Sequence, residues 1–197
     1  MADLTEAKAA LRRALRERRA ARDEAARAAA GERLAAHAGA IPAGTVAAFV
    51  GTRTEPPTLP LVEALRASGR RVLLPVLRED MDLEWAEFTG RDALRPARLG
   101  LLEPVGPSLG LGAVAAADLV LAPALAVDVG GRRLGQGGGS YDRALERAGA
   151  PVVAIVFDDE VRDEPVPVEP HDRPVAGVLT PDGGLRWVGA PPQRKTL

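Results

Sequence analysis

Short, continuous apolar segments alternate with helix-like segments along most of this chain, and this alternation constrains the fold more than any other feature. Segments that are apolar throughout, rather than at every second residue, are typical of parallel strands covered by helices on both faces. Five segments fit this description: 45–51, 71–77, 118–125, 151–157 and 175–180. We therefore predict an α/β fold with three layers, α/β/α, around a mostly parallel central sheet.

Helical spacing and capping residues predict where the helices lie between these strands. Asp3 and Glu6 form a capping-box pattern, and the apolar residues that follow recur at helical spacing. The predicted helices are 3–19, 23–37, 57–69 and 140–150. We expect residues 1–190 to form a single domain, with the N-terminal helices (3–38) packed on it, and residues 191–197 to form a flexible tail.

Three further segments have less regular patterns. Residues 83–88 alternate between apolar and polar side chains, which predicts an edge strand, and residues 185–188 are expected to close a hairpin through 182–184. The segment 91–117 is rich in glycine and proline. Such a long irregular segment is interpreted either as a crossover between strands or as a lid over a binding site.

Composition excludes several classes of protein. The chain has 197 residues, a net charge of −1 and no cysteine. Its charge gives no electrostatic basis for binding nucleic acid, and without cysteine it has neither disulfides nor thiolate metal sites. No apolar run approaches the roughly 20 residues needed to span a bilayer, and the N-terminus lacks the apolar region of a signal peptide. We expect a cytoplasmic monomer that binds neither nucleic acid nor membranes.

The segment 131–143, GRRLGQGGGSYDR, contains five glycines, three arginines, a tyrosine and an aspartate. It follows a predicted strand and precedes a predicted helix, which is where ligands bind in α/β sheets. Glycines let successive backbone N–H groups converge on an anion, and a helix start adds partial positive charge. The segment matches neither the Walker nor the dinucleotide pattern, so a phosphate loop and an ordinary turn both remain open. Asp142 would serve the helix dipole or hold Mg²⁺.

Three basic residues of the first predicted helix, Lys8, Arg12 and Arg16, share one face because they are spaced by four. Lys8 is one of only two lysines among 26 basic residues. Lysine offers a compact point charge that the planar guanidinium of arginine does not reproduce. The residues alone leave open whether this face is solvated or binds an anion.

The segment 121–145, LAPALAVDVGGRRLGQGGGSYDRAL, resembles the signature of the 5-formyltetrahydrofolate cyclo-ligase family. Five other segments are similar to family segments, so the resemblance spans residues 8–180: KAALRRALRERR, TRTEPPTLPLVEAL, RVLLPVL, GLLEP and PVEPHDRPVAGVLT. Ser140 departs from the pattern, which has a tyrosine there, and Gln136 stands where an aromatic or basic residue is common. The resemblance implies the fold of ribose-phosphate isomerase and CoA-transferase domains.

The resemblance also implies a reaction, in which ATP drives conversion of 5-formyltetrahydrofolate to 5,10-methenyltetrahydrofolate with release of ADP and phosphate. It implies that Lys8 and Arg12 contact the ATP phosphates, and that Lys8 and Arg133 are catalytic. Val50, Glu55 and Tyr141 would bind the folate. Asp142 and Asp172 would hold Mg²⁺. The other implied ATP-binding residues form the loop: Arg133, Leu134, Gly135, Gln136, Gly137, Gly138, Gly139, Ser140 and Tyr141.

Other interpretations of these residues remain open. Glu55 also fits an ordinary loop charge, Val50 and Tyr141 also fit core packing, and Ser140 fits either a helix N-cap or a phosphate contact. Two rival functions also remain. One is an ATP-dependent enzyme of the same family that acts on another formylated or amide-bearing heterocycle, and the other is a non-catalytic nucleotide-binding module.

Overall fold

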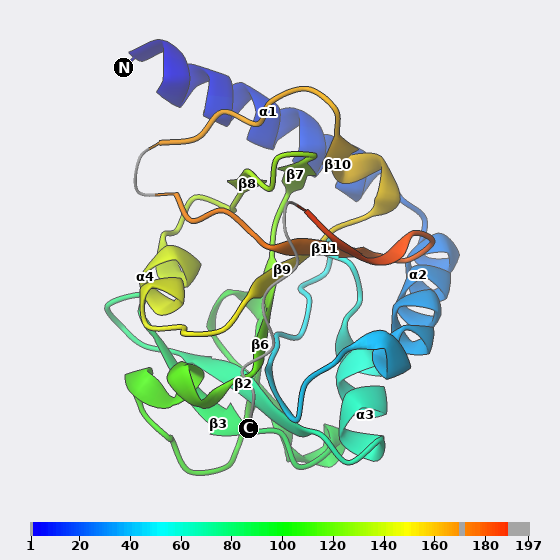
Figure 1. Ribbon diagram of the computed structural model, residues 1–197, viewed down its shortest axis with the longest axis vertical. Coiled ribbons are helices and arrows are strands. Elements are labelled where there is room, and N and C mark those ends of the chain that lie inside the picture. Colours follow the sequence, from blue (N-terminus) through cyan, green and yellow to red (C-terminus); the bar gives the residue numbers. More distant parts are fainter. Residues whose placement is uncertain (1, 170–171, 189–197) are drawn as a thin grey trace.

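The computed structural model describes residues 2–169 and 172–188. A seven-stranded sheet runs through it in the order β12-β11-β9-β6-β1-β2-β3 (Figure 1). Its strands are β1 (Thr45–Ala47), β2 (Arg71–Leu77), β3 (Leu83–Glu87), β6 (Leu119–Pro123), β9 (Val152–Ile155), β11 (Gly177–Thr180) and β12 (Gly184–Trp187). The five central strands are parallel, and only the edge strands β3 and β12 of this sheet pair antiparallel. The predicted mostly parallel sheet is therefore confirmed, as are the edge strand and the closing hairpin.

Helices cover both faces of this sheet, as the three-layer prediction required. The helices α2 (Glu24–Ala36) and α3 (Leu59–Ala67) lie on one face, and α4 (Ser140–Glu146) lies on the other together with the 3-10 helix η4 (Leu111–Ala116) (Figure 1). Neighbouring strand residues point to opposite layers. Val46 packs with the α2 and α3 side, whereas Ala47 packs with the α4 side. Burial on both faces explains why the strand segments are apolar throughout.

The segment between the sixth strand and α4 differs from the prediction of one continuous glycine loop. A hairpin of β7 (Ala126–Asp128) and β8 (Arg133–Leu134) interrupts it, and β10 (Val161–Arg162) pairs with β7 in a small sheet. The buried Asp128 carboxylate causes the turn because it accepts the backbone N–H groups of Gly130 and Arg132. The loop that borders the ligand cavity is therefore shorter and begins after β8.

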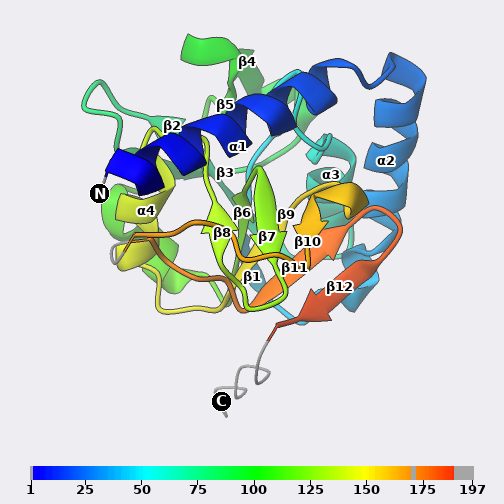
Figure 2. The same ribbon diagram turned by 90° about the horizontal axis from the view of Figure 1, so that it is seen from above.

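The helix α1 (Ala2–Ala20) lies along the small sheet (Figures 1 and 2). Leu15 of α1 packs on Ala126 and Leu134, which makes a separate apolar cluster beneath the helix. A fully buried ion pair holds the end of α1, since Arg19 Nε and Nη2 each lie 2.7 Å from a Glu160 carboxylate oxygen. Glu160 ends the 3-10 helix η5 (Asp158–Glu160), just beyond β9.

The irregular segment between β3 and β6 forms a short projecting arm. It consists of η2 (Arg91–Ala93), β4 (Leu94–Pro96), η3 (Arg98–Gly100) and β5 (Leu102–Pro104), followed by η4. The strands β4 and β5 pair antiparallel, and the buried Glu103 accepts the backbone N–H of Leu77 at 2.9 Å. This bond fixes the base of the arm to the end of β2.

The remaining helical element is η1 (Ala38–Ala40), which continues from α2. Within the described residues, no helix combines the length and apolarity that crossing a bilayer requires. The predicted tail, 191–197, lies outside the described residues.

Candidate active site

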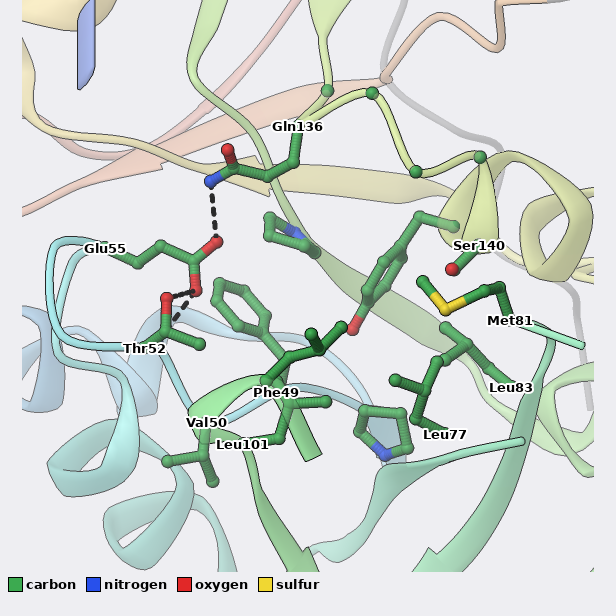
Figure 3. A pocket seen from close by; sticks show the side chains of 18 of the residues that line it. Phe49, Val50, Thr52, Glu55, Leu77, Met81, Leu83, Leu101, Gln136 and Ser140 are labelled. Carbon is green, nitrogen blue, oxygen red and sulfur yellow. Dashed lines mark hydrogen bonds between the residues drawn. The ribbon is translucent and has the colours of Figure 1, made fainter. Parts of the chain in front are cut away.

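A cavity of about 590 Å³ opens where the parallel strands end (Figure 3). Residues that follow β1 and residues at the ends of β2 and β6 form its floor, which is the expected ligand position in an open α/β sheet. The arm contributes Leu99, Leu101 and Leu102 to one wall. The glycine loop and the start of α4 form the opposite wall, from Gly135 to Asp142.

Most of the cavity wall is apolar. Phe49 and Val50 follow β1, and Tyr141 packs edge-on against Phe49, with ring centroids 6.4 Å apart and planes at 75°. Leu77, Met81, Leu83 and Leu101 complete the apolar region that Figure 3 shows. A flat, partly aromatic ligand would fit such a wall, because apolar surfaces with a few polar groups are typical of small-molecule sites.

Tyr141 presents an unsatisfied polar group to this region. Its hydroxyl oxygen is buried and has no hydrogen-bond partner among the described residues. Burial, with a smaller contribution from the Glu55 charge, raises the pKa of the phenol, so the hydroxyl stays protonated. Buried hydroxyls are usually hydrogen-bonded. A ligand with a polar atom at this position would therefore satisfy Tyr141.

A carboxylate forms the polar end of the cavity. Glu55, only 7% exposed, lies in the loop between β1 and α3. Its Oε2 accepts the backbone N–H of Thr52 at 2.8 Å and the Thr52 hydroxyl at 2.9 Å, and its Oε1 accepts Gln136 Nε2 at 3.1 Å (Figure 3). The backbone of this loop packs so closely that a Cβ on Gly51 would lie only 2.3 Å from the Pro56 carbonyl oxygen. This packing directs Glu55 across the cavity mouth.

Two arginines of α1 hold the backbone of the glycine loop. Arg12 Nε donates to the Gly135 carbonyl at 3.0 Å, and Arg16 Nη2 donates to the Gln136 carbonyl at 2.6 Å. The loop then turns through Gly137 at φ 100° and Gly139 at φ 71°, a region that favours glycine. Gly139 is the N-cap of α4, so Ser140 is the first helical residue rather than the N-cap that one interpretation expected.

Arg133 lies at the junction of two cavities. It is 5% exposed, donates from Nη1 to the Pro123 carbonyl at 3.2 Å and pairs through Nη2 with Asp142. Besides the main cavity, Arg133 lines a smaller one of about 200 Å³, together with Arg132, Val168, Asp172, Arg173 and Pro174. A cation in this position can contact an anion in either cavity.

Asp172 lines the second cavity rather than the main one, and Lys8, which lines neither, contacts Asp172. Lys8 is 4% exposed, and its Nζ lies 2.6 Å from both Glu169 Oε2 and Asp172 Oδ2. Burial opposes the Lys8 charge, but the hydrogen bonds and charges of Asp172 and Glu169 outweigh it and raise the Lys8 pKa. Lys8 is thus a charged, internally paired residue.

The structure brings some of the predicted site residues together and separates others. Val50, Glu55, Arg133 and the residues from Gly135 to Asp142 line one cavity. Leu134 is buried beneath α1, so only its backbone could face a ligand. Asp142 and Asp172, the two predicted Mg²⁺ ligands, line different cavities, and no group of three or more metal-ligating side chains exists within 2–169 and 172–188.

Several cavity residues have no role predicted from the sequence. Arg16 shared the predicted cationic face, which is the signal that could have identified it. Thr52 precedes Glu55 by three residues, but nothing in the sequence indicates their hydrogen bond. Leu99 is an apolar residue with 69% exposure and φ 59° at the cavity mouth. Only the folded arm shows that it faces a ligand site.

These features together define a class of protein. An open α/β sheet whose strands end at an apolar cavity, with a carboxylate at one end and a glycine loop on one wall, is typical of enzymes for small molecules. A family model described as the 5-formyltetrahydrofolate cyclo-ligase family matches residues 4–181. The chain therefore belongs to the 5-formyltetrahydrofolate cyclo-ligase family, as the motifs predicted.

Individual relatives agree with this assignment. The chain is 45% identical over 148 residues to a 5-formyltetrahydrofolate cyclo-ligase of Mycolicibacterium smegmatis. The matched region covers 72% of this chain and 75% of the relative. It is 32% identical over 163 residues to the Escherichia coli K12 5-formyltetrahydrofolate cyclo-ligase, and this match covers 80% of this chain and 89% of the relative. The solved structure of Aquifex aeolicus 5,10-methenyltetrahydrofolate synthetase has the same fold, with a TM-score of 0.78, 23% identity and 96% of each chain covered.

Proposed function

We propose that this protein is an ATP-dependent ligase that cyclises 5-formyltetrahydrofolate to 5,10-methenyltetrahydrofolate and releases ADP and phosphate. One observation carries the proposal. A single cavity joins an apolar wall and the Glu55 carboxylate to the glycine loop and Arg133. A flat heterocycle and a phosphate group can therefore lie side by side in it.

The chemical difficulty is that the formyl oxygen is a poor leaving group. In the proposed reaction this oxygen attacks the γ-phosphorus of ATP, an O–P bond forms, and the bond from phosphorus to the ADP oxygen breaks. N10 of the folate then attacks the activated carbon. The C–O bond breaks, phosphate leaves with that oxygen, and N10 loses its proton. The protein contributes mainly by positioning the reactants and stabilising transferred charge.

The folate end of the cavity is assigned to Glu55 and the apolar wall. A pterin ring offers N–H donors on an amide-like edge, which a carboxylate accepts well. Phe49 and Val50 would pack on the ring because they follow β1 at the cavity floor. The Tyr141 hydroxyl, which has no partner in the described part of the chain, would hydrogen-bond a polar atom of the bound substrate.

The phosphate end is assigned to the loop between Gly135 and Ser140, with cations around it. Arg133 faces the cavity and would stabilise the transferred phosphoryl group. Arg12 and Arg16 of α1 hold the loop backbone and add positive charge. Lys8 contacts Asp172, which lines the second cavity, so its proposed contact with the nucleotide requires the phosphates to reach past Arg133.

The proposed magnesium site is limited by the carboxylates available. Mg²⁺ is usually held by one or two carboxylates together with substrate phosphates, so a cluster of three protein ligands is not required. Asp142 fits this pattern because it lines the cavity beside the loop. Asp172 would have to exchange its contact with Lys8 for the metal. When bound, Mg²⁺ would neutralise phosphate charge, and Asp142 would orient it.

The proposed function is tested by following methenyltetrahydrofolate formation by absorbance. The purified protein is mixed with 5-formyltetrahydrofolate in the presence and absence of ATP and Mg²⁺. We expect product only when both are present, with ADP and phosphate formed in equal amounts to the product. No product at high protein concentration with both present would refute the proposal and favour another heterocycle as substrate. Size-exclusion chromatography tests the expected monomer.

A further inference from the structure

Gln136 connects the two ends of the cavity. Its side chain spans from the glycine loop to the loop that carries Glu55 (Figure 3). On its other side, its backbone carbonyl accepts Arg16 Nη2 at 2.6 Å, and its Oε1 lies 3.4 Å from Arg16 Nε and Nη2. The residues Arg16, Gln136 and Glu55 therefore form a continuous hydrogen-bonded chain from α1 across the cavity mouth.

The orientation of the Gln136 amide follows from the charges on either side. Its oxygen faces the Arg16 cation, and its nitrogen donates to the Glu55 anion at 3.1 Å. A flipped amide would place donor against donor and acceptor against acceptor. The amide is therefore held by both neighbours at once, and a change at one neighbour alters the other contact.

This arrangement fills most of the hydrogen-bonding capacity of the Glu55 carboxylate. A carboxylate has about four acceptor positions. Thr52 occupies Oε2 with two donors, and Gln136 occupies one position on Oε1. Because Thr52 fills Oε2, the open side of the carboxylate is Oε1, and a ligand that places two donors on Oε1 must displace Gln136.

An anion at the loop would release Gln136. Arg16 lines the cavity, and its guanidinium here donates to neutral oxygens of Gln136. A charge-assisted bond to phosphate is roughly twice as strong as a bond to a neutral oxygen. A phosphate bound beside the loop would therefore take the Arg16 donors and remove one of the two contacts that hold the amide. Gly137, which follows Gln136 at φ 100°, is a point where the loop can adjust.

We infer that Gln136 is a positioning residue that couples the two ligands: it occupies Glu55 in the free protein and yields it to the substrate when nucleotide binds. The inference rests on the proposed function, since it takes the folate to bind at Glu55 and the phosphates at the loop. It also states how the two binding events affect each other. Nucleotide binding increases the affinity for 5-formyltetrahydrofolate through Gln136.

The experiment measures the dissociation constant of 5-formyltetrahydrofolate by calorimetry, with and without a non-hydrolysable ATP analogue and Mg²⁺. In the wild-type protein we expect the analogue to tighten substrate binding by about fivefold or more, the usual lower range of such coupling. In Gln136→Leu we expect substrate binding without analogue to be about tenfold tighter, because a bond to a charged group no longer has to be displaced. The ratio of the two constants should then approach one.

Two further variants separate coupling from general damage. Arg16→Leu removes the same contact to Gln136 that a bound phosphate would take. We therefore expect substrate binding without analogue to tighten toward the analogue-bound value, and the ratio to approach one. Arg13→Leu alters an exposed arginine of the same helix and should keep the wild-type ratio. Thermal unfolding of each variant checks that it is folded.

Three results would overturn the inference: equal ratios in the wild type and Gln136→Leu, a wild-type ratio near one, or weaker substrate binding in Gln136→Leu without analogue. The last result would mean that Gln136 supports Glu55 instead of occupying it. Failure of the proposed function is distinguishable, because the wild-type protein would then bind no 5-formyltetrahydrofolate under either condition and form no product. That outcome would overturn both.

Discussion

The attachment of α1 to the rest of the protein depends on a buried charge. Arg19 is 0% exposed and Glu160 is 1% exposed, with two contacts of 2.7 Å between them. Arg19 also donates to the Ala124 carbonyl at 2.6 Å, and its guanidinium carbon lies 5.8 Å from the centre of the Phe157 ring. Arg19→Met keeps an unbranched apolar stem but removes the guanidinium and with it all of these polar contacts.

The expected cost follows from what remains after the change. Glu160 would stay buried, with the Phe157 N–H at 2.9 Å as its remaining donor in the described part of the chain. Removing one partner of a buried ion pair typically costs about 3–5 kcal/mol. For a protein of this size each kcal/mol lowers the unfolding temperature by about 2–4 °C, which predicts a decrease of about 6–20 °C. Because α1 carries Arg12 and Arg16 to the loop, we also expect the KM for ATP to rise.

The assay is urea and thermal unfolding, followed by circular dichroism, with a matched control on the same helix. Arg18 pairs with Asp159 at the surface, where both side chains are about half exposed. Exposed pairs contribute about 0–1 kcal/mol, so Arg18→Met should be nearly neutral. The double variant Arg19→Met with Glu160→Met should recover most of the loss because no buried charge remains. A loss below about 1 kcal/mol in Arg19→Met would refute the reasoning from buried charge.

Three further predictions concern the cavity. Glu55→Gln should weaken 5-formyltetrahydrofolate binding by about tenfold or more, with little change in ATP affinity, because a bond to a charged group is lost; calorimetry with each ligand checks this, and the reverse pattern would contradict the assignment. Lys8→Arg keeps the charge but not the compact ammonium, so the KM for ATP should rise about tenfold. Steady-state kinetics measure this KM. An unchanged KM would mean that Lys8 serves only its ion pairs with Asp172 and Glu169 and does not contact ATP. Asp142→Asn should raise the Mg²⁺ concentration for half-maximal rate by about tenfold or more; magnesium titration at fixed ATP tests it, and an unaltered titration would remove Asp142 from the metal site.

The strands could be predicted because their burial is nearly complete. Val46 and Ala47 point to opposite layers and are both buried, so the sequence of β1 is apolar without a break. The same pattern misplaces the end of the strand. The apolar run continues to Val50, whereas β1 ends at Ala47 and the next residues form the cavity floor. An apolar run in the sequence indicates that its residues are buried, but it does not show whether they form a strand or the wall of a ligand site.

The contacts that organise the site could not be predicted, because they join residues far apart in the sequence. Arg16 and Gln136 are 120 residues apart, and Lys8 and Asp172 are 164 apart. The helical spacing of the cations predicted that they share a face but not what they contact. The β7–β8 hairpin could not be predicted either, because its turn at Gly131 resembles the start of one glycine loop.

Two of the cations proposed for the nucleotide are paired with the two carboxylates proposed for the metal. Arg133 contacts Asp142, and Lys8 contacts Asp172, so these two cations proposed for the nucleotide neutralise the two carboxylates proposed for the metal. Binding of phosphate alone would take an arginine or lysine from its carboxylate and leave that carboxylate without its cation. Mg²⁺ alone would do the reverse. When ATP and Mg²⁺ bind together, the phosphates take the cations and the metal takes the carboxylates, so Arg133, Lys8, Asp142 and Asp172 each keep a partner of opposite charge. The geometry therefore favours the metal–nucleotide complex over either component, and the magnesium titration of Asp142→Asn measures one half of that exchange.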